Sequence, residues 1–468
     1  MSRIPLWRFV FLAVLLLGIT GSAQDEPMRI ERLFEAASAD DTLARAALMD
    51  LASDWRNVDA AMLVEMAAVM RIQSPTASAI PRRLLAFLGQ QTGQSFGEDT
   101  ARWRDWIRAS PARSSSQTYA RFKRALYARV DPLAQTFFAP GVGAAVRLDE
   151  IVWSGTTVGK NRPLDYPDAV PAVDATYMNA SDMVFGVAFR AQVRAYPMST
   201  LERHPVVHDR FNGREVTIVH CRWSGSTVAF ESDIDGRRFT LDDSAFVYRS
   251  STVLFDEGTK SLWSMVTGQP LVGELAGSGL SLRPIGAATV ASWKEWRSMN
   301  PATTVVSTMA IGADRLEEAT PRQTAATERV QVSAPHATEP VLPGAEVLGM
   351  QLVDGVSREP VRLAIDLDFL RKHPLYTFSR STQQVVDPDR IGTVVITSPG
   401  GAFRVYQILP NHFFPDQPFG PTFVDDKGLR WRMAEEDLTN PIHFLRLPAT
   451  RVSWLAWHEY FPDSLAIK

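Results

Sequence analysis

The feature that most constrains the fold of this chain is an internal repeat in its C-terminal part. Short landmarks in one stretch recur in the same order in a later stretch. The paired landmarks are Val184–Val187 with Val347–Met350, Val193–Arg194 with Val361–Arg362, Leu201–Pro205 with Leu370–Pro374, and Ser292–Trp296 with Ser453–Trp457. Because a duplicated unit must fold in both places, the sequence predicts two similar halves that pack together.

Both halves have the texture of β-structure. Short β-branched runs such as Val216–Val219 alternate with Gly, Pro and Asp, a pattern typical of strands joined by turns. Asn212-Gly213 and Asp235-Gly236 are strong hairpin signals, because these residues adopt the positive φ of tight turns. We therefore predict β-rich repeats at residues 145–310 and 346–468. The stretch 311–345, rich in Ala, Thr, Glu and Pro, is predicted to be a linker or long loop.

The N-terminal region has a helical pattern instead. Apolar residues recur at spacings of three and four in Leu43–Leu51 and again in Met62–Met70. Asp40 precedes the first of these runs, where a carboxylate can cap a helix. We predict a helical, solenoid-like region at residues 28–138, and hence an α+β protein in which a helical N-terminal region precedes a duplicated β-rich unit.

Residues 1–23 are typical of a secretory signal peptide. Arg3 and Arg8 accompany an apolar run from Phe9 to Ile19, and small residues lead up to Ala23. The run is about half of the roughly 20 apolar residues that a membrane-spanning helix needs. We expect cleavage near Ala23 and a periplasmic or secreted protein with no membrane span after cleavage; retention of the segment as an anchor stays open.

Charge and cysteine content exclude several classes of function. The chain has 49 Lys and Arg against 52 Asp and Glu, a net charge of -3, so it offers no basic field for nucleic acid. The single cysteine, Cys221, excludes an intramolecular disulfide and any Cys-rich metal site. A free cysteine is more often buried than reactive, because it is among the most buried residue types.

The repeat separates residues that both halves need from residues that could carry chemistry. His204 and His373 occur in both halves, each before a proline, so a structural role is sufficient to explain them. His208, His220 and Cys221 occur only in the first half. If the protein has a functional site, we expect it there.

The stretch Leu201–Phe230, which reads LERHPVVHDRFNGREVTIVHCRWSGSTVAF, resembles the bacterial domain of unknown function 3179 family. That family carries a His-x-x-x-Asn-Asp stretch, a hairpin and a Cys-Pro-Leu-Cys/Thr strand end. Arg194–Pro197, Thr267-Gly268 and Leu275–Gly277 also look like it, and the resemblance runs from about Trp103 to the C-terminus. It implies a repeated β-rich fold and frequent export, with no established activity.

Carried over by position, the resemblance places His204, Asp209 and Cys221 at the family's His, Asp and first Cys. The family's Asn is His208 in this chain, and its second Cys or Thr is Ser224. A redox pair of two thiols is therefore excluded.

Two chemical hypotheses follow. His204, His208 and Cys221 could bind copper or zinc, since imidazole and thiolate suit both metals. Alternatively, Cys221 could serve a thiol-dependent enzyme in which His204 or His208 lowers the pKa of the thiol and Asp209 orients the imidazole.

The third hypothesis, and the function we predict, is a binding protein without catalysis. Cys221 is then buried, and a protein partner is held by the helical N-terminal region or between the halves. Ser224, Arg249, Asp256 and Trp263 would be hairpin and core residues, although an arginine and an aspartate near a tryptophan can also line a polar pocket.

Overall fold

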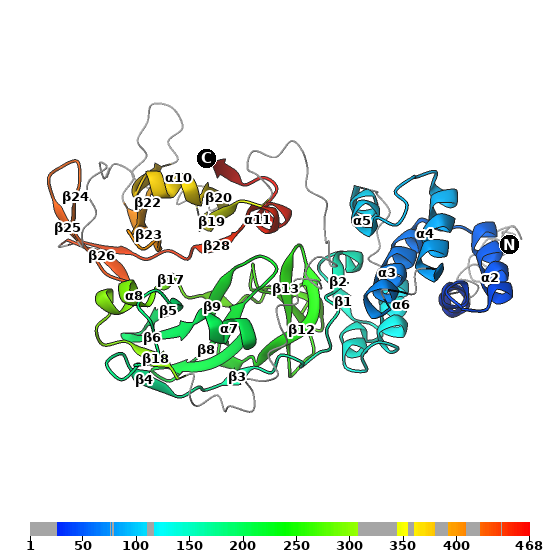
Figure 1. Ribbon diagram of the computed structural model, residues 1–468, viewed down its shortest axis with the longest axis horizontal. Coiled ribbons are helices and arrows are strands. Elements are labelled where there is room, and N and C mark those ends of the chain that lie inside the picture. Colours follow the sequence, from blue (N-terminus) through cyan, green and yellow to red (C-terminus); the bar gives the residue numbers. More distant parts are fainter. Residues whose placement is uncertain are drawn as a thin grey trace, which may run out of the picture. The chain divides into compact units, whose positions relative to one another are not determined.

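The computed structural model describes residues 26–74, 76, 79–109, 117–307, 344–353, 360–379, 392–408, 422–440 and 442–468. It confirms the α+β class, with a helical region followed by β-rich sheets (Figure 1). The chain divides into two compact units, one up to Gly155 and one from Thr156 onward. The expected signal peptide, and all of the expected linker except Gly344 and Ala345, lie outside the described residues.

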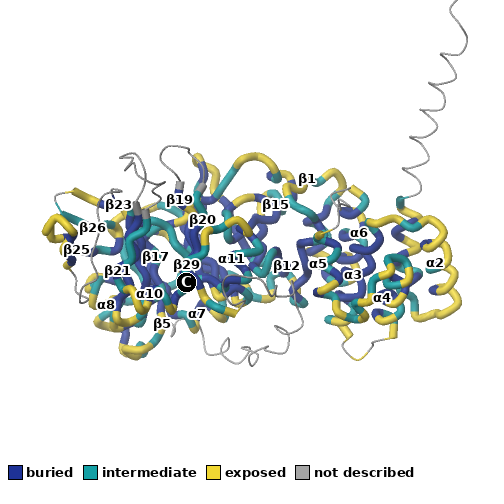
Figure 2. The backbone as a smooth tube through the Cα atoms, turned by 90° about the horizontal axis from the view of Figure 1, so that it is seen from above, coloured by how far each residue is buried: buried dark blue, intermediate teal, exposed yellow. Residues whose placement is uncertain are grey.

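The helical unit is organised around one central helix. Its helices include α2 (Asp41–Ser53), α3 (Asn57–Gln73), α4 (Ala79–Thr92), α5 (Thr100–Ala109), α6 (Gln117–Tyr127) and the short helix η1 (Ala134–Phe138). They are followed by β1 (Gly143–Ala144), η2 (Leu148–Glu150) and β2 (Ile151–Trp153). The side chain of Asp40 caps α2 by accepting the backbone N–H groups of Thr42 and Leu43. Helix α3 is buried on most of its surface (Figure 2), because its run Ala60–Val69 is apolar apart from Glu65. No helix in the described ranges is long and apolar enough to cross a membrane.

The first half of the β-rich unit contains three main sheets. One has the strand order β17-β5-β6-β18-β4, a second has the order β16-β9-β8-β7-β3, and a third contains the neighbours β15-β14-β13-β12. The bounds are β3 (Leu164–Asp165), β4 (Ala169–Pro171), β5 (Met183–Phe189), β6 (Gln192–Pro197), α7 (Met198–Arg203), β7 (Val206–Phe211), β8 (Arg214–His220), β9 (Thr227–Glu231), β12 (Leu241–Tyr248), β13 (Ser251–Asp256), β14 (Leu262–Ser264), β15 (Pro270–Gly273), β16 (Arg283–Pro284), β17 (Ala288–Ser292), α8 (Trp293–Met299) and β18 (Thr304–Val306).

Both expected hairpins form in this half. Asn212 and Gly213 join β7 to β8 with φ values of 45° and 83°. Asp235 and Gly236 join β10 (Asp233–Ile234) to β11 (Arg237–Arg238) in the same way, with φ values of 52° and 80°. Tight hairpin turns of this type need a positive φ at both central residues, and Asn-Gly and Asp-Gly pairs adopt it readily.

The second half repeats this arrangement with its own strands. Its sheet β28-β19-β20-β29 has the order of β17-β5-β6-β18, and β29 is parallel to β20 as β18 is to β6. Sheets β21-β22-β23 and β24-β25-β26-β27 complete it. The bounds are β19 (Glu346–Val353), β20 (Pro360–Asp366), α10 (Leu367–Lys372), β21 (Leu375–Ser379), β22 (Gly392–Thr397), β23 (Phe403–Ile408), β24 (Thr422–Val424), β25 (Arg430–Met433), β26 (Asp437–Thr439), β27 (His443–Leu445), β28 (Thr450–Ser453), α11 (Trp454–Tyr460) and β29 (Leu465–Ile467).

The two halves contact each other reciprocally through their closing helices. Glu295 of α8 accepts a hydrogen bond from Ser398, in the turn after β22, and pairs with Arg404 of β23 at 3.0 Å. In the opposite direction, the backbone N–H of Ser453, which caps α11, donates to the carbonyl oxygen of Ser224, in the turn after β8, at 2.9 Å. Thus α8 contacts the turn after β22 of the second half, and the start of α11 contacts the turn after β8 of the first half.

Candidate functional site

The corner after β8 places Cys221 in the hydrophobic core. The thiol is 0 % exposed and packs in a cluster that contains Val206, Val219 and Trp263. Its Sγ accepts backbone N–H groups from Thr252 at 3.3 Å and Ser224 at 3.5 Å. Burial agrees with the usual behaviour of a free cysteine, and it leaves no thiol at an accessible surface for the hypothesis of a cysteine nucleophile.

Asp209 has a different partner from the one that hypothesis gave it. Its carboxylate accepts two hydrogen bonds from Arg194, at 2.5 and 2.6 Å, and one from the hydroxyl of Tyr196. Burial, together with the Asp209 charge, raises the pKa of Tyr196 well above its ordinary value, so that hydroxyl stays a donor. Asp209 therefore joins β7 to β6. Its carboxylate does not orient an imidazole, because its hydrogen bonds are made to Arg194 and Tyr196.

The two histidines of the metal hypothesis contact different groups. His204 ends α7, and its Nδ1 lies 3.2 Å from the carbonyl oxygen of Arg162. His208 is 7 % exposed; its Nδ1 lies 2.7 Å from Oδ1 of Asp165 and its Nε2 lies 2.8 Å from the carbonyl oxygen of Leu241. Both ring nitrogens of His208 thus lie within hydrogen-bond distance of an oxygen atom.

This arrangement does not support a copper or zinc site formed by His204, His208 and Cys221. A histidine ligand needs a ring nitrogen that is available to the metal, and both nitrogens of His208 already contact oxygen atoms of Asp165 and Leu241. Within the described ranges, no group of three or more His, Cys, Asp or Glu side chains is placed to hold a metal ion.

The structure brings His208 close to Asp242, an acid that the sequence analysis missed. Asp242 and Asp243 follow Leu241, the first residue of β12, whose carbonyl oxygen His208 contacts. Asp242 is 8 % exposed, and burial, reinforced by the charge of Asp243, raises its pKa to about 7. Burial also raises the pKa of Asp243. We call Asp165, His208, Asp242 and Asp243 the acid–histidine cluster.

Backbone irregularity accompanies the acid–histidine cluster. The pairing of β12 with β13 slips between Asp243 and Phe246, and Ala245 has a φ of 62°. Positive φ is costly for alanine, and such strain concentrates at functional sites. The sequence signal was the pair Asp242-Asp243 inside a strand-like run, since aspartate is depleted in strands.

His220 lies at the end of β8, beside the Cys221 corner. It is 8 % exposed, and its Nδ1 lies 2.9 Å from Oγ1 of Thr227. Burial and the positive charge of Arg222 lower the pKa of His220 to about 4. The ring is therefore neutral at physiological pH and acts as a buried hydrogen-bonding group.

The remaining candidates are hairpin and core residues. Ser224 is buried with its hydroxyl 2.7 Å from that of Ser226. Arg249 sits in the turn between β12 and β13 with its guanidinium 5.0 Å from the centre of the Tyr248 ring. Asp256 and Trp263 are buried and bond to each other at 3.0 Å.

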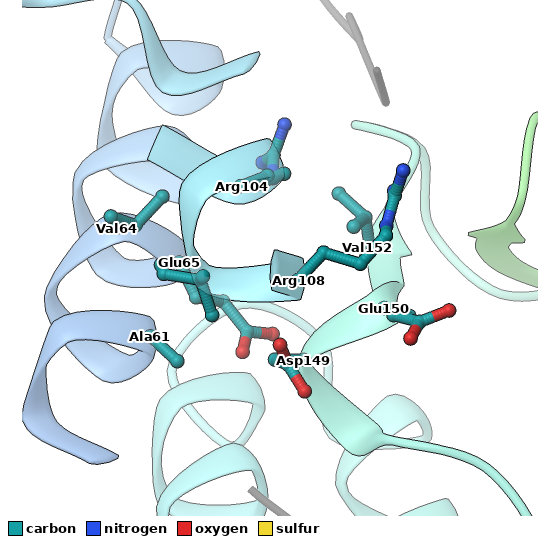
Figure 3. A pocket seen from close by; sticks show the side chains of 9 residues that line it. Ala61, Val64, Glu65, Arg104, Arg108, Asp149, Glu150 and Val152 are labelled. Atoms are coloured by element: carbon teal, nitrogen blue, oxygen red, sulfur yellow. The ribbon is translucent and has the colours of Figure 1, made fainter. Parts of the chain in front are cut away.

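A separate hollow lies within the helical unit, between α3, α5 and the segment 149–152 (Figure 3). Its lining includes Glu65, Arg104 and Asp149. Glu65 accepts hydrogen bonds from the buried hydroxyls of Tyr119 and Tyr127, each at 2.6 Å, and from a buried lysine, Lys123. The cavity volume is about 20 Å³, which has room for about one water molecule and not for an organic ligand.

Comparison with known proteins gives one family. A family model described as "Protein of unknown function (DUF3179)" matches residues 163–464. No curated protein and no solved structure matches the chain. The match begins after the helical unit, and so later than the expected start near Trp103. Because the matched residues make up more than half of the sequence, the chain belongs to the DUF3179 family of proteins of unknown function.

Proposed function

We propose that this DUF3179 protein is an exported binding protein that acts through contacts with a partner and not through a reaction at Cys221. The observation that carries the proposal is the position of the Cys221 sulfur, which is 0 % exposed and accepts two backbone N–H groups. The other candidates for thiol or metal chemistry each hold a structural contact: Asp209 with Arg194, and His208 with Asp165 and Leu241.

Alkylation with iodoacetamide tests this proposal. Cys221 should stay unmodified in the folded protein and react once urea unfolds it, because the reagent must reach the sulfur. A matched control is the exposed position 298, as Ser298→Cys in a Cys221→Ser background, which should react in the folded state. If Cys221 and this control are alkylated at equal rates in the folded protein, the proposal is contradicted and the hypothesis of a thiol-dependent enzyme is favoured.

Two further measurements test the alternatives and the compartment. Elemental analysis of the purified protein should give no stoichiometric copper or zinc; a metal that is lost in both His208→Ala and Cys221→Ser would restore the metal hypothesis. The N-terminus of protein recovered from the periplasm should follow Ala23. An intact N-terminus in the membrane fraction would indicate a retained anchor.

A second candidate function is acid–base chemistry at the acid–histidine cluster. It is favoured by a carboxyl, Asp242, whose pKa burial raises to about 7, close to a histidine that holds two acceptors. Groups that titrate near neutral pH suit general acid–base catalysis. Hydrolysis of 4-nitrophenyl acetate is a simple probe: turnover that follows the ionisation of Asp242 and is lost in Asp242→Asn would favour an enzyme. Equal rates for the native protein and the variant would leave the binding proposal.

A further inference from the structure

The sheet β24-β25-β26-β27 of the second half is buried on one face only. Its inner side chains pack in a core cluster with Tyr406; they are Phe423, Trp431, Met433, Leu438 and Phe444. Successive side chains of a strand point to opposite faces, so the residues between them form an outer face. Figure 1 shows the β24–β25 hairpin at the periphery of this half.

Exposed apolar side chains gather on this outer face and at one end of the sheet. Val424 is 37 % exposed and Leu445 is 63 % exposed. Leu429 and Ile442, at 44 % and 52 %, lie in the β24–β25 and β26–β27 turns. Because the strands are antiparallel, these two turns are at the same end of the sheet.

The same face carries two arginines. Arg430 and Arg432 are exposed on β25, and their guanidinium groups form no ion pair with any described residue. Of the acids nearby, Asp425 accepts from Trp431 at 3.1 Å, and Asp437 bonds to His443 at 2.8 Å. Asp426 and Glu436 are exposed in the turns before and after β25.

The corresponding strands of the first half are different. Strands β13, β14 and β15 are buried along their whole length, so that both of their faces are covered. We call Val424, Leu429, Ile442, Leu445, Arg430 and Arg432 of the second half the hairpin face. Both faces of these strands are therefore covered in the first half, whereas the outer face of the equivalent sheet is exposed in the second half.

We propose that the hairpin face docks on an anionic membrane surface. Leu429 and Ile442 would enter the boundary between headgroups and acyl chains, while Arg430 and Arg432 meet the lipid phosphates. Leu429 and Ile442 are exposed aliphatic residues in turns at one end of the sheet, and Arg430 lies directly beside Leu429, so apolar and positively charged side chains are next to each other there. The inference rests on the proposed binding function and names the partner.

Sedimentation of the full chain with lipid vesicles tests the inference. We expect binding to vesicles of equimolar phosphatidylcholine and phosphatidylglycerol and not to phosphatidylcholine alone. The double variant Arg430→Gln/Arg432→Gln should bind about 25-fold more weakly, since each arginine near an anionic surface contributes about fivefold. Leu429→Asp/Ile442→Asp should also lose binding. The controls Arg45→Gln and Val173→Asp change exposed residues elsewhere and should bind normally.

The outcomes separate the inference from the proposed function. Absence of vesicle binding, or binding that both double variants retain, would overturn the inference. Equal affinity for soluble polyglutamate without lipid would assign the face to an acidic protein and overturn it as well. The altered side chains are exposed, so unchanged circular dichroism should show that the variants fold. A reactive Cys221 would remove the proposed function without changing the vesicle result.

Discussion

The indole nitrogen of Trp263 donates a hydrogen bond to a carboxylate oxygen of Asp256, 3.0 Å away, in the core of the first half. The second half repeats this contact between Trp431 and Asp425, at 3.1 Å. In both halves the other carboxylate oxygen accepts a backbone N–H of the following turn, at 2.6 Å from Thr259 in the first half. The aspartate thus holds a hairpin turn against a buried tryptophan.

Asp256→Ala should therefore lower the free energy of unfolding by about 3 kcal/mol, because it leaves a buried indole N–H and a turn N–H without acceptors. Urea unfolding followed by tryptophan fluorescence measures the loss. Glu274→Ala is the control, since that side chain is exposed and should cost little. A loss no larger than the control's would show that the contact is not stabilising.

A glycine beneath a tryptophan recurs in both halves and explains two of the repeat's landmarks. A Cβ added at Gly186 would lie 2.3 Å from Trp296, and one added at Gly349 would lie 2.2 Å from Trp457. Gly186→Ala and Gly349→Ala should each lower the free energy of unfolding by about 2 kcal/mol or more, because a buried ring must move. Gly344→Ala, which meets no atom within 4 Å, should change it little. Thermal unfolding of the three variants tests this, and equal midpoints would refute it.

Much of the fold could be predicted because its signals are local. The spacing of apolar residues marked α2 and α3, and Asn212-Gly213 supplied the positive φ of a tight turn. The repeat landmarks carried more information, since positions such as Gly186 and Trp296 meet only after folding.

The site was less predictable because partners come from other strands. Asp209 was expected to orient an imidazole, but its carboxylate accepts hydrogen bonds from Arg194 and Tyr196 of β6. The raised pKa of Asp242 depends on burial by tertiary packing, which residue type alone does not reveal. The burial of Cys221 likewise depends on residues distant in sequence, such as Trp263 and Leu282, which pack around it.

A buried arginine, Arg404, joins the two halves. Arg404 is 0 % exposed and pairs with Glu435 at 2.7 Å and with Glu295 of α8 at 3.0 Å. Glu435→Gln should lower the free energy of unfolding by about 3 kcal/mol or more, because a buried guanidinium loses a charged partner. Glu436→Gln changes an exposed neighbour and should be nearly neutral. Similar urea midpoints for the two variants would show that this pair does not stabilise the protein.

The effects of Asp242 and His220 on stability change with pH in opposite directions. The pKa of Asp242 rises from 3.8 to about 7 on folding, so the folded state holds this proton more tightly and the contribution of Asp242 to stability falls as pH rises through that window. The pKa of His220 falls from 6.5 to about 4, so its contribution is present above that range and is lost as pH falls through it.

In the native protein, the pH dependences of the unfolding free energy that come from Asp242 and His220 should largely cancel. A variant that removes one of these groups should reveal the pH dependence caused by the other group. Between pH 4 and 6.5, Asp242→Asn should gain stability relative to the native protein as pH rises, whereas His220→Gln should lose it. The comparison is the free energy of urea unfolding at a series of pH values, with each variant referred to the native protein so that the remaining groups cancel. The double variant should follow the native curve with a constant offset, because both titrations are then absent. If the two single variants run parallel to the native protein, neither group has the shifted pKa in the folded state.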